Sequence, residues 1–280
     1  MKAHADFGLD FDVGSKSLDE TAAILADTVH AGQAQAVALA CKWIGDLRYP
    51  GVRRVYDSYF SGAGGMDVGF QAAGFVSGNR VDKDVERCKM NRRNVDGGTC
   101  FSDDLNTQGA RKRARGRQKN RGGPALVAGG GPSCPWSSGQ TQNIPGHVSL
   151  NSLAGSMDFV NLWDHLLDPR AVETHPLMIL YECAGDRCYQ TKQPELCGSD
   201  ADTPYVALVK LLNRHDYHVE LIKGLKASDQ GNPTMRERAF VLGYKKLPGE
   251  ELIVPSLDSE SESDSDDDCQ IPISFCQIPR

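Results

Sequence analysis

The sequence predicts an α/β fold, in which a doubly wound, mostly parallel β-sheet carries helices on both faces. Short continuous apolar runs alternate with helical segments between residues 53 and 246, and glycine-rich turns follow two of the runs. Continuous apolar runs are typical of strands buried on both faces of a parallel sheet, and the alternation with helices indicates crossover connections. The 280 residues, 40% of them hydrophobic, are enough for one sizeable domain with accessory segments.

The first 50 residues precede this pattern and predict two helices. Ser17 opens a Ser-Leu-Asp-Glu sequence that resembles a capping box, so a helix is expected from there through about His30. A second helix is expected from about Ala34 to Leu47, and it ends before Pro50 because proline cannot continue a helix.

From residue 53 onward, strands and helices are expected in regular alternation. Val55–Tyr59 is a short apolar strand that leads through a glycine turn into a helix over Met66–Ala73. A strand near Phe75 and a helix over Asp84–Arg92 come next. The remaining elements are a buried strand at Ala125–Ala128, an amphipathic helix at Ser156–Leu167, a strand at Leu177–Tyr181, a helix at Tyr205–Arg214, and strands at Tyr217–Leu225 and Ala239–Tyr244.

The net charge of −6 conceals two blocks of opposite sign. Residues 111–121 contain seven cations and no acid, whereas residues 258–268 are all acid and serine. Such blocks bury little apolar area and are usually solvated or disordered. The basic block is a solvated loop, a nucleic-acid contact or a nuclear import signal. No packed structure is expected after Lys246.

Neither the cysteines nor the apolar runs indicate a secreted or membrane protein. The nine cysteines are odd in number and lack a framework spacing, which predicts reduced thiols in an intracellular protein, nuclear if the host is eukaryotic. The longest apolar run, Ala34 to Ile44, is too short to span a bilayer. Cys183, Cys188 and Cys197 lack a second Cys-x-x-Cys or histidine pair, so no metal site is predicted.

The segment Tyr59-Phe-Ser-Gly-Ala-Gly-Gly-Met-Asp-Val-Gly-Phe-Gln-Ala-Ala-Gly-Phe75 is the most informative part of the chain. Glycines between a strand and a helix let a ligand approach the backbone closely. The string resembles the Phe-Ser-Gly-Ala-Gly-Gly signature of cytosine-C5 DNA methyltransferases, where this loop holds the methionine part of S-adenosylmethionine. Three further segments are similar to that family's motifs and follow in its order, at Gly129–Ser137, Ile179–Gly185 and Leu225–Gly243.

The resemblance covers residues 53 to 246 and implies a Rossmann-like class I methyltransferase fold. It implies a methyltransferase catalytic domain at 51–247 with a basic insertion at 107–123. The local pattern and composition place an N-terminal helical segment at 1–50 before this domain and an acidic disordered tail at 248–280 after it.

The resemblance also implies catalytic roles for side chains in these motifs. Cytosine C5 is a poor nucleophile, so the ring must be activated by addition of a thiolate at C6, and Cys134 is the candidate. Glu182 resembles the family's acid at N3, and Arg238, with Arg236 beside it, resembles the arginine that orients the base at O2. A base inside a duplex would have to be flipped out of the stack. On residue type alone, Cys134 could be a buried structural cysteine, and the arginines could form surface salt bridges.

The cofactor contacts implied by the resemblance lie on four loops. Asp104, with Leu105, is the candidate for the adenine amine. Arg80 occupies the position of the family's ribose-binding glutamate, and an arginine has no acceptor for ribose hydroxyls, so Asp82 is the candidate there. Arg80→Glu is accordingly expected to tighten cofactor binding. The other candidates are Phe60, Ser61, Gly62, Ala63, Gly64, Gly65, Met66 and, on the nucleophile loop, Pro132.

Several positions depart from the family pattern and keep three functions open. Ser133 replaces a proline, one residue instead of two separates Cys134 from Trp136, and Thr234 replaces a glutamine. The leading hypothesis is methylation of cytosine C5 in DNA. The alternatives are an RNA (tRNA) cytosine-C5 methyltransferase and an impaired methyltransferase that acts as a binding or regulatory subunit.

No segment of this sequence is large enough to be the family's target-recognition domain, so a second subunit that supplies recognition is a candidate partner. Ala31–Gly45 is similar to the family's final helix, with Gln33 at the position of its asparagine. This stretch is either a circularly permuted element or an ordinary amphipathic lead helix.

Overall fold

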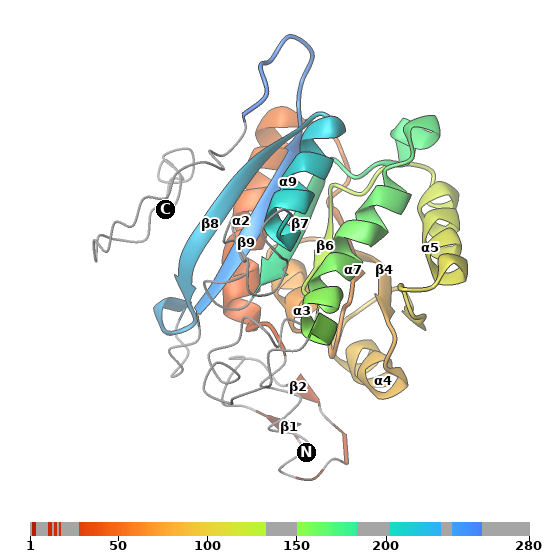
Figure 1. Cartoon of the computed structure of the whole chain (residues 1–280). Coiled ribbons are helices and arrows are strands. Elements are labelled where there is room, and N and C mark those ends of the chain that lie inside the picture. The colour runs from red at the N-terminus through yellow and green to blue at the C-terminus, as the bar shows by residue number, and fades with distance from the viewer. Residues whose placement is uncertain are drawn as a thin grey trace.

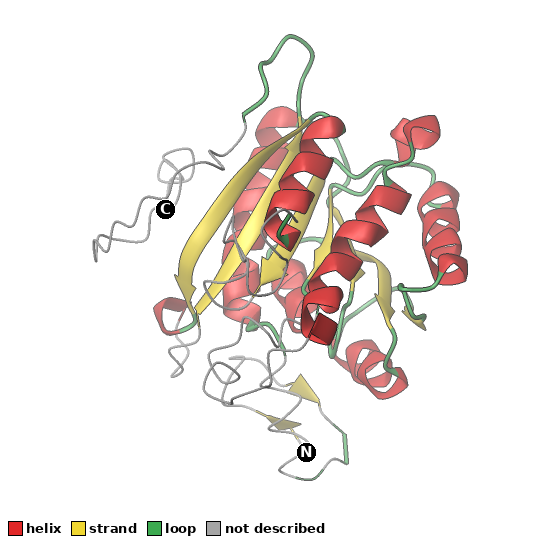
Figure 2. Cartoon of the chain, in the orientation of Figure 1, coloured by secondary structure: helices red, strands yellow, loops and turns green. Residues whose placement is uncertain are grey.

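The structure is a computed structural model that describes residues 2–3, 11–12, 14–15, 17, 28–132, 150–183, 202–230 and 237–253. A twisted sheet forms the centre of the molecule, and helices pack on both of its faces (Figures 1 and 2).

Seven strands form the central sheet in the order β5-β4-β3-β6-β7-β9-β8. The five strands from β5 to β7 are parallel, and β9 is antiparallel to both of its neighbours. This order confirms the predicted fold class, a doubly wound Rossmann-like sheet with one reversed strand. The bounds are β3 (Val55–Tyr59), β4 (Val76–Asp82), β5 (Cys100–Ser102), β6 (Val127–Gly130), β7 (Met178–Cys183), β8 (Tyr217–Lys226) and β9 (Glu237–Lys245). Two short strands, β1 (Lys2–Ala3) and β2 (Phe11–Asp12), form a separate antiparallel pair.

The helices divide between the two faces of the sheet. On one face lie α2 (Ala31–Arg48), α3 (Gly65–Ala72) and α4 (Val85–Asn94), and on the other α5 (Gln108–Asn120), α7 (Leu150–Leu166) and α9 (Pro204–Arg214). Two short 3₁₀ helices, Pro169–Thr174 and Ser228–Gln230, lie in the connections.

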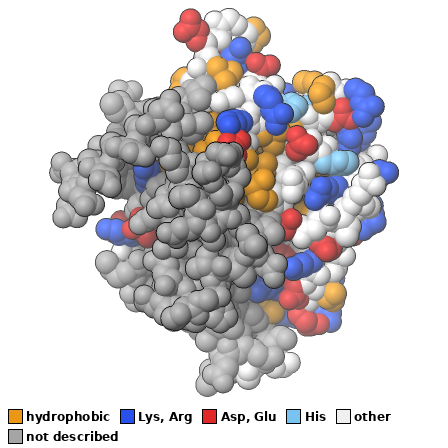
Figure 3. Space-filling model, in the orientation of Figure 1, with side chains coloured by type: hydrophobic (Ala, Val, Ile, Leu, Met, Phe, Trp, Pro, Cys, Tyr) orange, Lys and Arg blue, Asp and Glu red, His pale blue; other side chains and the backbone are white. Residues whose placement is uncertain are grey.

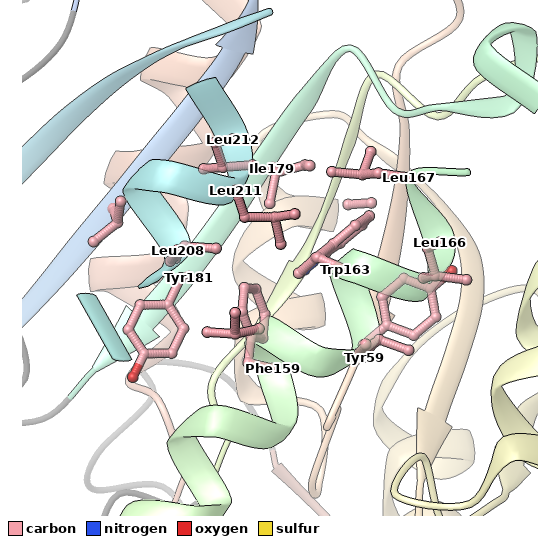
Figure 4. Close-up of a cluster of buried hydrophobic side chains, with 14 of the residues drawn as sticks. Tyr59, Phe159, Trp163, Leu166, Leu167, Ile179, Tyr181, Leu208, Leu211 and Leu212 are labelled. Carbon is pink, nitrogen blue, oxygen red and sulfur yellow. The ribbon is translucent and has the colours of Figure 1, made fainter. Parts of the chain in front are cut away.

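The core beneath α7 and α9 explains why the predicted amphipathic helix packs where it does. Trp163 is fully buried, and its ring meets Tyr59 of β3 edge-on, with centroids 5.7 Å apart. Figure 4 shows the leucines of α9 meeting Ile179 and Tyr181 of β7 beside this tryptophan. Fully burying one such aliphatic or aromatic side chain contributes about 1.5–3 kcal/mol. This cluster therefore fixes the end of β3 that leads into the glycine turn.

The basic run 111–121 is helical as far as Asn120, which corrects the expectation of a solvated loop. Thr107 caps α5, with its hydroxyl accepting from the Ala110 amide at 3.3 Å, and the helix buries Ala110, Ala114 and Gln118 at four-residue spacing. The run folds because acids in other parts of the fold balance its cations. Arg113 and Arg117 pair with Asp103, Arg115 pairs with Asp168, and Arg121 pairs with the buried Asp57. Along the chain, α5 is the helix that connects β5 to β6.

The packed chain also extends past residue 247, where the acidic tail was expected to begin. Glu250 Oε2 accepts hydrogen bonds from Arg48 Nη2 at 2.5 Å and from the Leu247 amide at 2.8 Å. The Ile253 amide donates to His218 Nδ1 at 2.9 Å, and the Val219 amide donates to the Ile253 carbonyl at 3.2 Å. Residues 247–253 therefore lie along the free edge of β8. Residues 254–280 lie outside the described part of the chain.

Most other predicted elements agree with the structure within a few residues. The strand at Val55–Tyr59 is β3 with the same bounds, whereas α7 begins six residues before the predicted Ser156. The short strand β5 was not predicted. Most of the helix expected from Ser17 to His30 lies outside the described residues. Within the described ranges, no helix is both long and apolar enough to cross a membrane.

Candidate functional site

The glycine loop between β3 and α3 crosses the carboxyl end of β4. Phe60, Gly62 and Gly64 all have left-handed backbone angles, with φ of 56°, 54° and 100°. Glycine is required at 64, where an added Cβ would lie 2.9 Å from Val95 Cγ2, while the same position on Gly62 faces open space. Strained backbone such as that at Phe60 is concentrated at functional sites, and the role of this loop in cofactor binding stays a prediction.

The side chains of the loop divide into those at its surface and those beneath it. Ala63 and Met66 are buried, and Met66 Sδ accepts from the Tyr56 hydroxyl at 2.7 Å. Ser61 Oγ lies 3.5 Å from Cys100 Sγ. Gly65 is the first residue of α3. Ala63 and Met66 thus pack below the loop, whereas Phe60 and Gly62 are partly exposed.

Asp82 is the last residue of β4 and holds the glycine loop directly. Its Oδ2 accepts from the Gly62 amide at 2.8 Å, and its Oδ1 accepts from the Asp84 amide at 2.9 Å. The Ser61 amide also donates to the Val81 carbonyl at 3.0 Å. A carboxylate at this position supplies the acceptor that ribose hydroxyls need.

Arg80 does not face this site, which corrects the expectation drawn from its place in the sequence. Its side chain is 1% exposed and donates to the carbonyls of Val95 at 3.1 Å and Gly97 at 2.5 Å, in the connection between α4 and β5. It lies two residues before the end of β4. Arg80 therefore ties this connection to the sheet, and its presence does not argue against a ribose site at Asp82.

Arg80→Glu is now expected to destabilise the fold rather than to tighten cofactor binding. A glutamate would place a buried negative charge against two carbonyl oxygens, and removing one member of a buried charged network costs about 3–5 kcal/mol. Urea unfolding would measure the loss, with Arg80→Lys, which keeps the charge, as the milder control. A variant as stable as the wild type, with tighter binding, would restore the original interpretation.

The loop after β5 offers the predicted adenine side of the site. Asp103 is held by Arg113 and Arg117, whose guanidinium groups lower the pKa of its carboxyl. Asp104 is exposed, and its Oδ1 accepts from the Asn106 amide at 3.1 Å. Leu105 is buried in the core. The ring centroids of Phe60 and Phe159 of α7 are 6.3 Å apart. Phe159 is an aromatic neighbour of the glycine loop that the sequence did not single out.

The end of β6 is built from three glycines because both neighbouring strands approach it closely. A Cβ on Gly129 would lie 2.1 Å from the Leu180 carbonyl oxygen, and one on Gly130 would lie 1.6 Å from that of Tyr59. A Cβ on Gly131 would lie 2.0 Å from Glu182 Oε2. The buried Pro132 follows directly. The segment that leads to Cys134 therefore touches the carboxyl group of Glu182.

Glu182 and Arg238 form an ion pair, as the register of β7 and β9 dictates. Glu182 is opposite Phe240, so Arg238, two residues away, is a diagonal neighbour on the same face of the sheet. Arg238 Nε lies 2.7 Å from Glu182 Oε1, and the side chains are 11% and 8% exposed. The Nε–H has no hydrogen-bond partner, so the contact is ionic and leaves a buried donor unused. The structure thus brings together two of the four predicted catalytic residues.

Gly131→Ala tests the contact between the nucleophile segment and Glu182. The added methyl group overlaps Glu182 Oε2, so the carboxyl group that contacts Arg238 must shift. We expect a loss of activity of at least about tenfold, because displacement of a catalytic group by about 1 Å can cost a hundredfold. Cofactor affinity should be unchanged. Methyl transfer and calorimetric titration, with Gly123→Ala at an open position as the control, would separate the two effects.

Cys134, Arg236, Ser133, Trp136 and Thr234 lie outside the described residues, and their roles remain predictions. Cys188 and Cys197 also lie outside them. In the described ranges, no group of three His, Cys, Asp or Glu side chains is placed to hold a metal ion.

Helix α2 lies against the helix that follows the glycine loop. An added Cβ on Gly69 of α3 would be 2.5 Å from both the Ala31 carbonyl oxygen and the Ala34 Cβ. Gln33 is fully buried, and its Nε2 donates to the Leu225 carbonyl at 2.6 Å. Leu225 pairs with Arg238, so the start of α2 lies close to the ion pair. This location suits a permuted element, and equally a lead helix that covers the sheet.

Comparisons with known proteins found methyltransferases that are similar to this chain. No family model matches the chain. Over 200 residues it is 26% identical to the Type II methyltransferase M.AquIA of Picosynechococcus sp., which covers 67% of this chain and 71% of that protein. Two similar solved structures are the S. pombe Dnmt2 methyltransferase (17% identity, TM-score 0.48) and the Entamoeba histolytica methyltransferase EhMeth (15% identity, TM-score 0.49). They match 72% and 73% of this chain, which spans only 52% and 57% of theirs. The chain is therefore similar in sequence to a methyltransferase, at 26% identity.

Proposed function

We propose that this protein transfers a methyl group from S-adenosylmethionine to C5 of cytosine in DNA, through a covalent bond between Cys134 and C6 of the base. The observation that carries the proposal is the Glu182–Arg238 ion pair, which lies against Gly131 at the start of the Cys134 segment. A carboxyl group and a guanidinium group beside a cysteine loop are the acid, donor and nucleophile that this reaction needs.

The residues fit the cofactor as well as the base. The open backbone at Gly62 and the carboxylate of Asp82 suit the methionine and ribose parts, and Asp104 remains exposed for the adenine amine. S-adenosylmethionine would supply an electrophilic methyl group. The described residues would bind and orient it.

Each step of the proposed reaction has a group in the chain to perform it. The Cys134 thiolate adds to C6, and the electron pair of the C5–C6 double bond makes C5 nucleophilic. Glu182 must be protonated for the next step, although its pairing with Arg238 favours the ionised form. The protonated Glu182 donates to N3 and relieves the negative charge that the addition builds on the ring. Arg238 would donate to O2 of the base from its guanidinium group, which carries N–H donors besides the Nε that faces Glu182. After C5 takes the methyl group, the C5 proton is lost to solvent and the thiolate is expelled. N3 returns its proton to Glu182, which regenerates the enzyme.

A covalent trap tests the proposal. A fluorine at C5 cannot leave as a proton does, so DNA that contains 5-fluorocytosine should stay attached to the protein after methyl transfer. We expect a cofactor-dependent adduct that survives denaturation, and that is absent from Cys134→Ser. An adduct with fluorinated RNA alone would favour the RNA methyltransferase. Absence of an adduct with either would refute the covalent mechanism.

The charge distribution gives α5 a smaller part in nucleic-acid binding than the sequence implied. Most of its arginines pair with acids of the fold, and basic and acidic side chains are interspersed on the face in Figure 3. A second subunit that supplies target recognition remains part of the proposal. Electrophoretic mobility shifts of DNA at increasing salt would measure how much binding this chain provides alone.

A further inference from the structure

A polar pair is buried beneath the glycine loop, between α3 and α4. Asp67 and Asn91 are 1% and 0% exposed. Asn91 Nδ2 donates to Asp67 Oδ2 at 3.2 Å, and Ser58 Oγ donates to the same oxygen at 3.2 Å. The other oxygen of each side chain, Asp67 Oδ1 and Asn91 Oδ1, has no hydrogen-bond donor. Two unsatisfied buried acceptors in one contact call for a physical explanation, because each costs about 1–3 kcal/mol.

We propose that Asp67 is protonated in the folded protein and forms a cyclic acid–amide pair with Asn91 that positions the glycine loop for the cofactor. A proton on Asp67 Oδ1 would be donated to Asn91 Oδ1, while Asn91 Nδ2 continues to donate to Asp67 Oδ2. One proton then satisfies both orphan oxygens and removes a buried charge. An ionised Asp67 would leave both acceptors unpaired.

The surroundings of Asp67 shift its pKa in both directions, and burial has the largest effect. It raises the pKa of Asp67 from 3.8 to about 7, although Arg80 of β4 and the hydrogen bonds from Ser58 and Asn91 oppose the rise. The position of Asp67 in the first turn of α3 also favours the charged form. The other titratable groups that interact with Asp67 are Tyr56 of β3 and Cys100 of β5, and burial or thiol pairing governs their protonation.

The pair acts on the loop through Gly64. This glycine caps α3, and a Cβ built on it would lie 3.0 Å from Asn91 Nδ2. The glycine loop therefore packs closely against the amide of Asn91. A negative charge on Asp67 reorients this amide, and the reoriented amide displaces the loop. This step rests on the proposed function, because it takes the glycine loop as the cofactor site.

The first test measures the stability of the protein without cofactor, and does not depend on the proposed function. Between pH 4 and pH 7, Asp67 is protonated in the folded state and ionised in the unfolded state. The stability of the wild type should therefore fall as pH rises from about 4 to about 7, and it should change no further above that. Asp67→Asn forms an amide–amide pair with the same two bonds and no ionisable group. The melting temperature of wild type should match that of Asp67→Asn near pH 4 and fall below it by pH 8. Glu251→Gln, at an exposed position, is the control for loss of one carboxylate.

A pH-independent difference between wild type and Asp67→Asn would overturn the proposal. Infrared spectroscopy provides a second readout that packing alone would not change. The carbonyl stretch of a protonated carboxyl group should be present in wild type at pH 5.5 and missing from Asp67→Asn. Its presence in both proteins with equal intensity would place the proton elsewhere.

The second test is calorimetric titration with S-adenosylhomocysteine at pH 6 to 8.5. Wild-type affinity should fall by up to about tenfold for each pH unit above 7, whereas Asp67→Asn affinity should stay constant. Equal pH profiles would overturn the link between the pair and the loop. If neither protein binds the cofactor product, the proposed function fails, and the stability measurements still decide whether Asp67 holds the proton.

Discussion

Replacing Cys134 with serine is expected to abolish methyl transfer while leaving cofactor affinity nearly unchanged. A serine hydroxyl is far less ionised than a thiol at neutral pH, so it cannot add to C6 of the base at a useful rate. The expected loss in kcat is on the order of 10³-fold or more, as for removal of other covalent nucleophiles. Affinity should hold because all of the described cofactor candidates except Pro132 lie at or after the ends of β3, β4 and β5, and not on the segment that carries Cys134.

Radiolabel transfer and calorimetric titration would measure the two quantities. Cys183→Ser is the matched control, since Cys183 is fully buried in β7, where its Sγ lies 3.6 Å from the Ala239 carbonyl oxygen. That variant should retain catalysis. Wild-type turnover by Cys134→Ser would remove Cys134 from the mechanism.

Replacing Glu182 with glutamine is expected to lower kcat by about 10²- to 10⁴-fold, the usual contribution of a general acid. Glutamine has nearly the same shape but no proton to give to N3. It also leaves Arg238, which is 11% exposed, without its anionic partner, and loss of one member of a buried ion pair costs about 3–5 kcal/mol of stability. Cofactor affinity should change little.

Arg238→Lys separates the two consequences of losing Glu182. Lysine keeps the positive charge beside Glu182 but loses the planar set of donors, so stability should be largely retained while turnover falls. Single-turnover methylation and urea unfolding would report on the two effects. If Glu182→Gln keeps full activity and loses only stability, the ion pair is structural and Glu182 is not the acid.

The alternation of apolar runs predicted the sheet because parallel strands buried on both faces need continuous apolar sequence. Val55–Tyr59 has the predicted bounds and all five of its residues are buried, although Asp57 and Ser58 interrupt its apolar run. The local pattern did not predict helix α5, because a run of seven cations suggests a solvated segment. The acids that neutralise it, Asp57, Asp103 and Asp168, come from other parts of the chain, and no window around the run contains all of them.

The site shows the same division between local motif and long-range contact. Glu182 and Arg238 were identified from motif order, and the register of β7 and β9 brings them together. Counting along the sequence placed Arg80 at the ribose position. Such counting cannot show that the Arg80 side chain turns instead to the carbonyls of Val95 and Gly97. The Asp67–Asn91 pair was missed for a similar reason. An acidic residue in an apolar helix was its only local signal.

The most direct test of the proposed function is the chemical identity of the methylated base. The protein, with cofactor labelled in its methyl group, would be incubated separately with duplex DNA and with RNA, and the products digested to nucleosides. The account predicts label in 5-methylcytosine from DNA, reduced to background by Cys134→Ser. Label in a different base, label from RNA alone, or no label in either nucleic acid would contradict it.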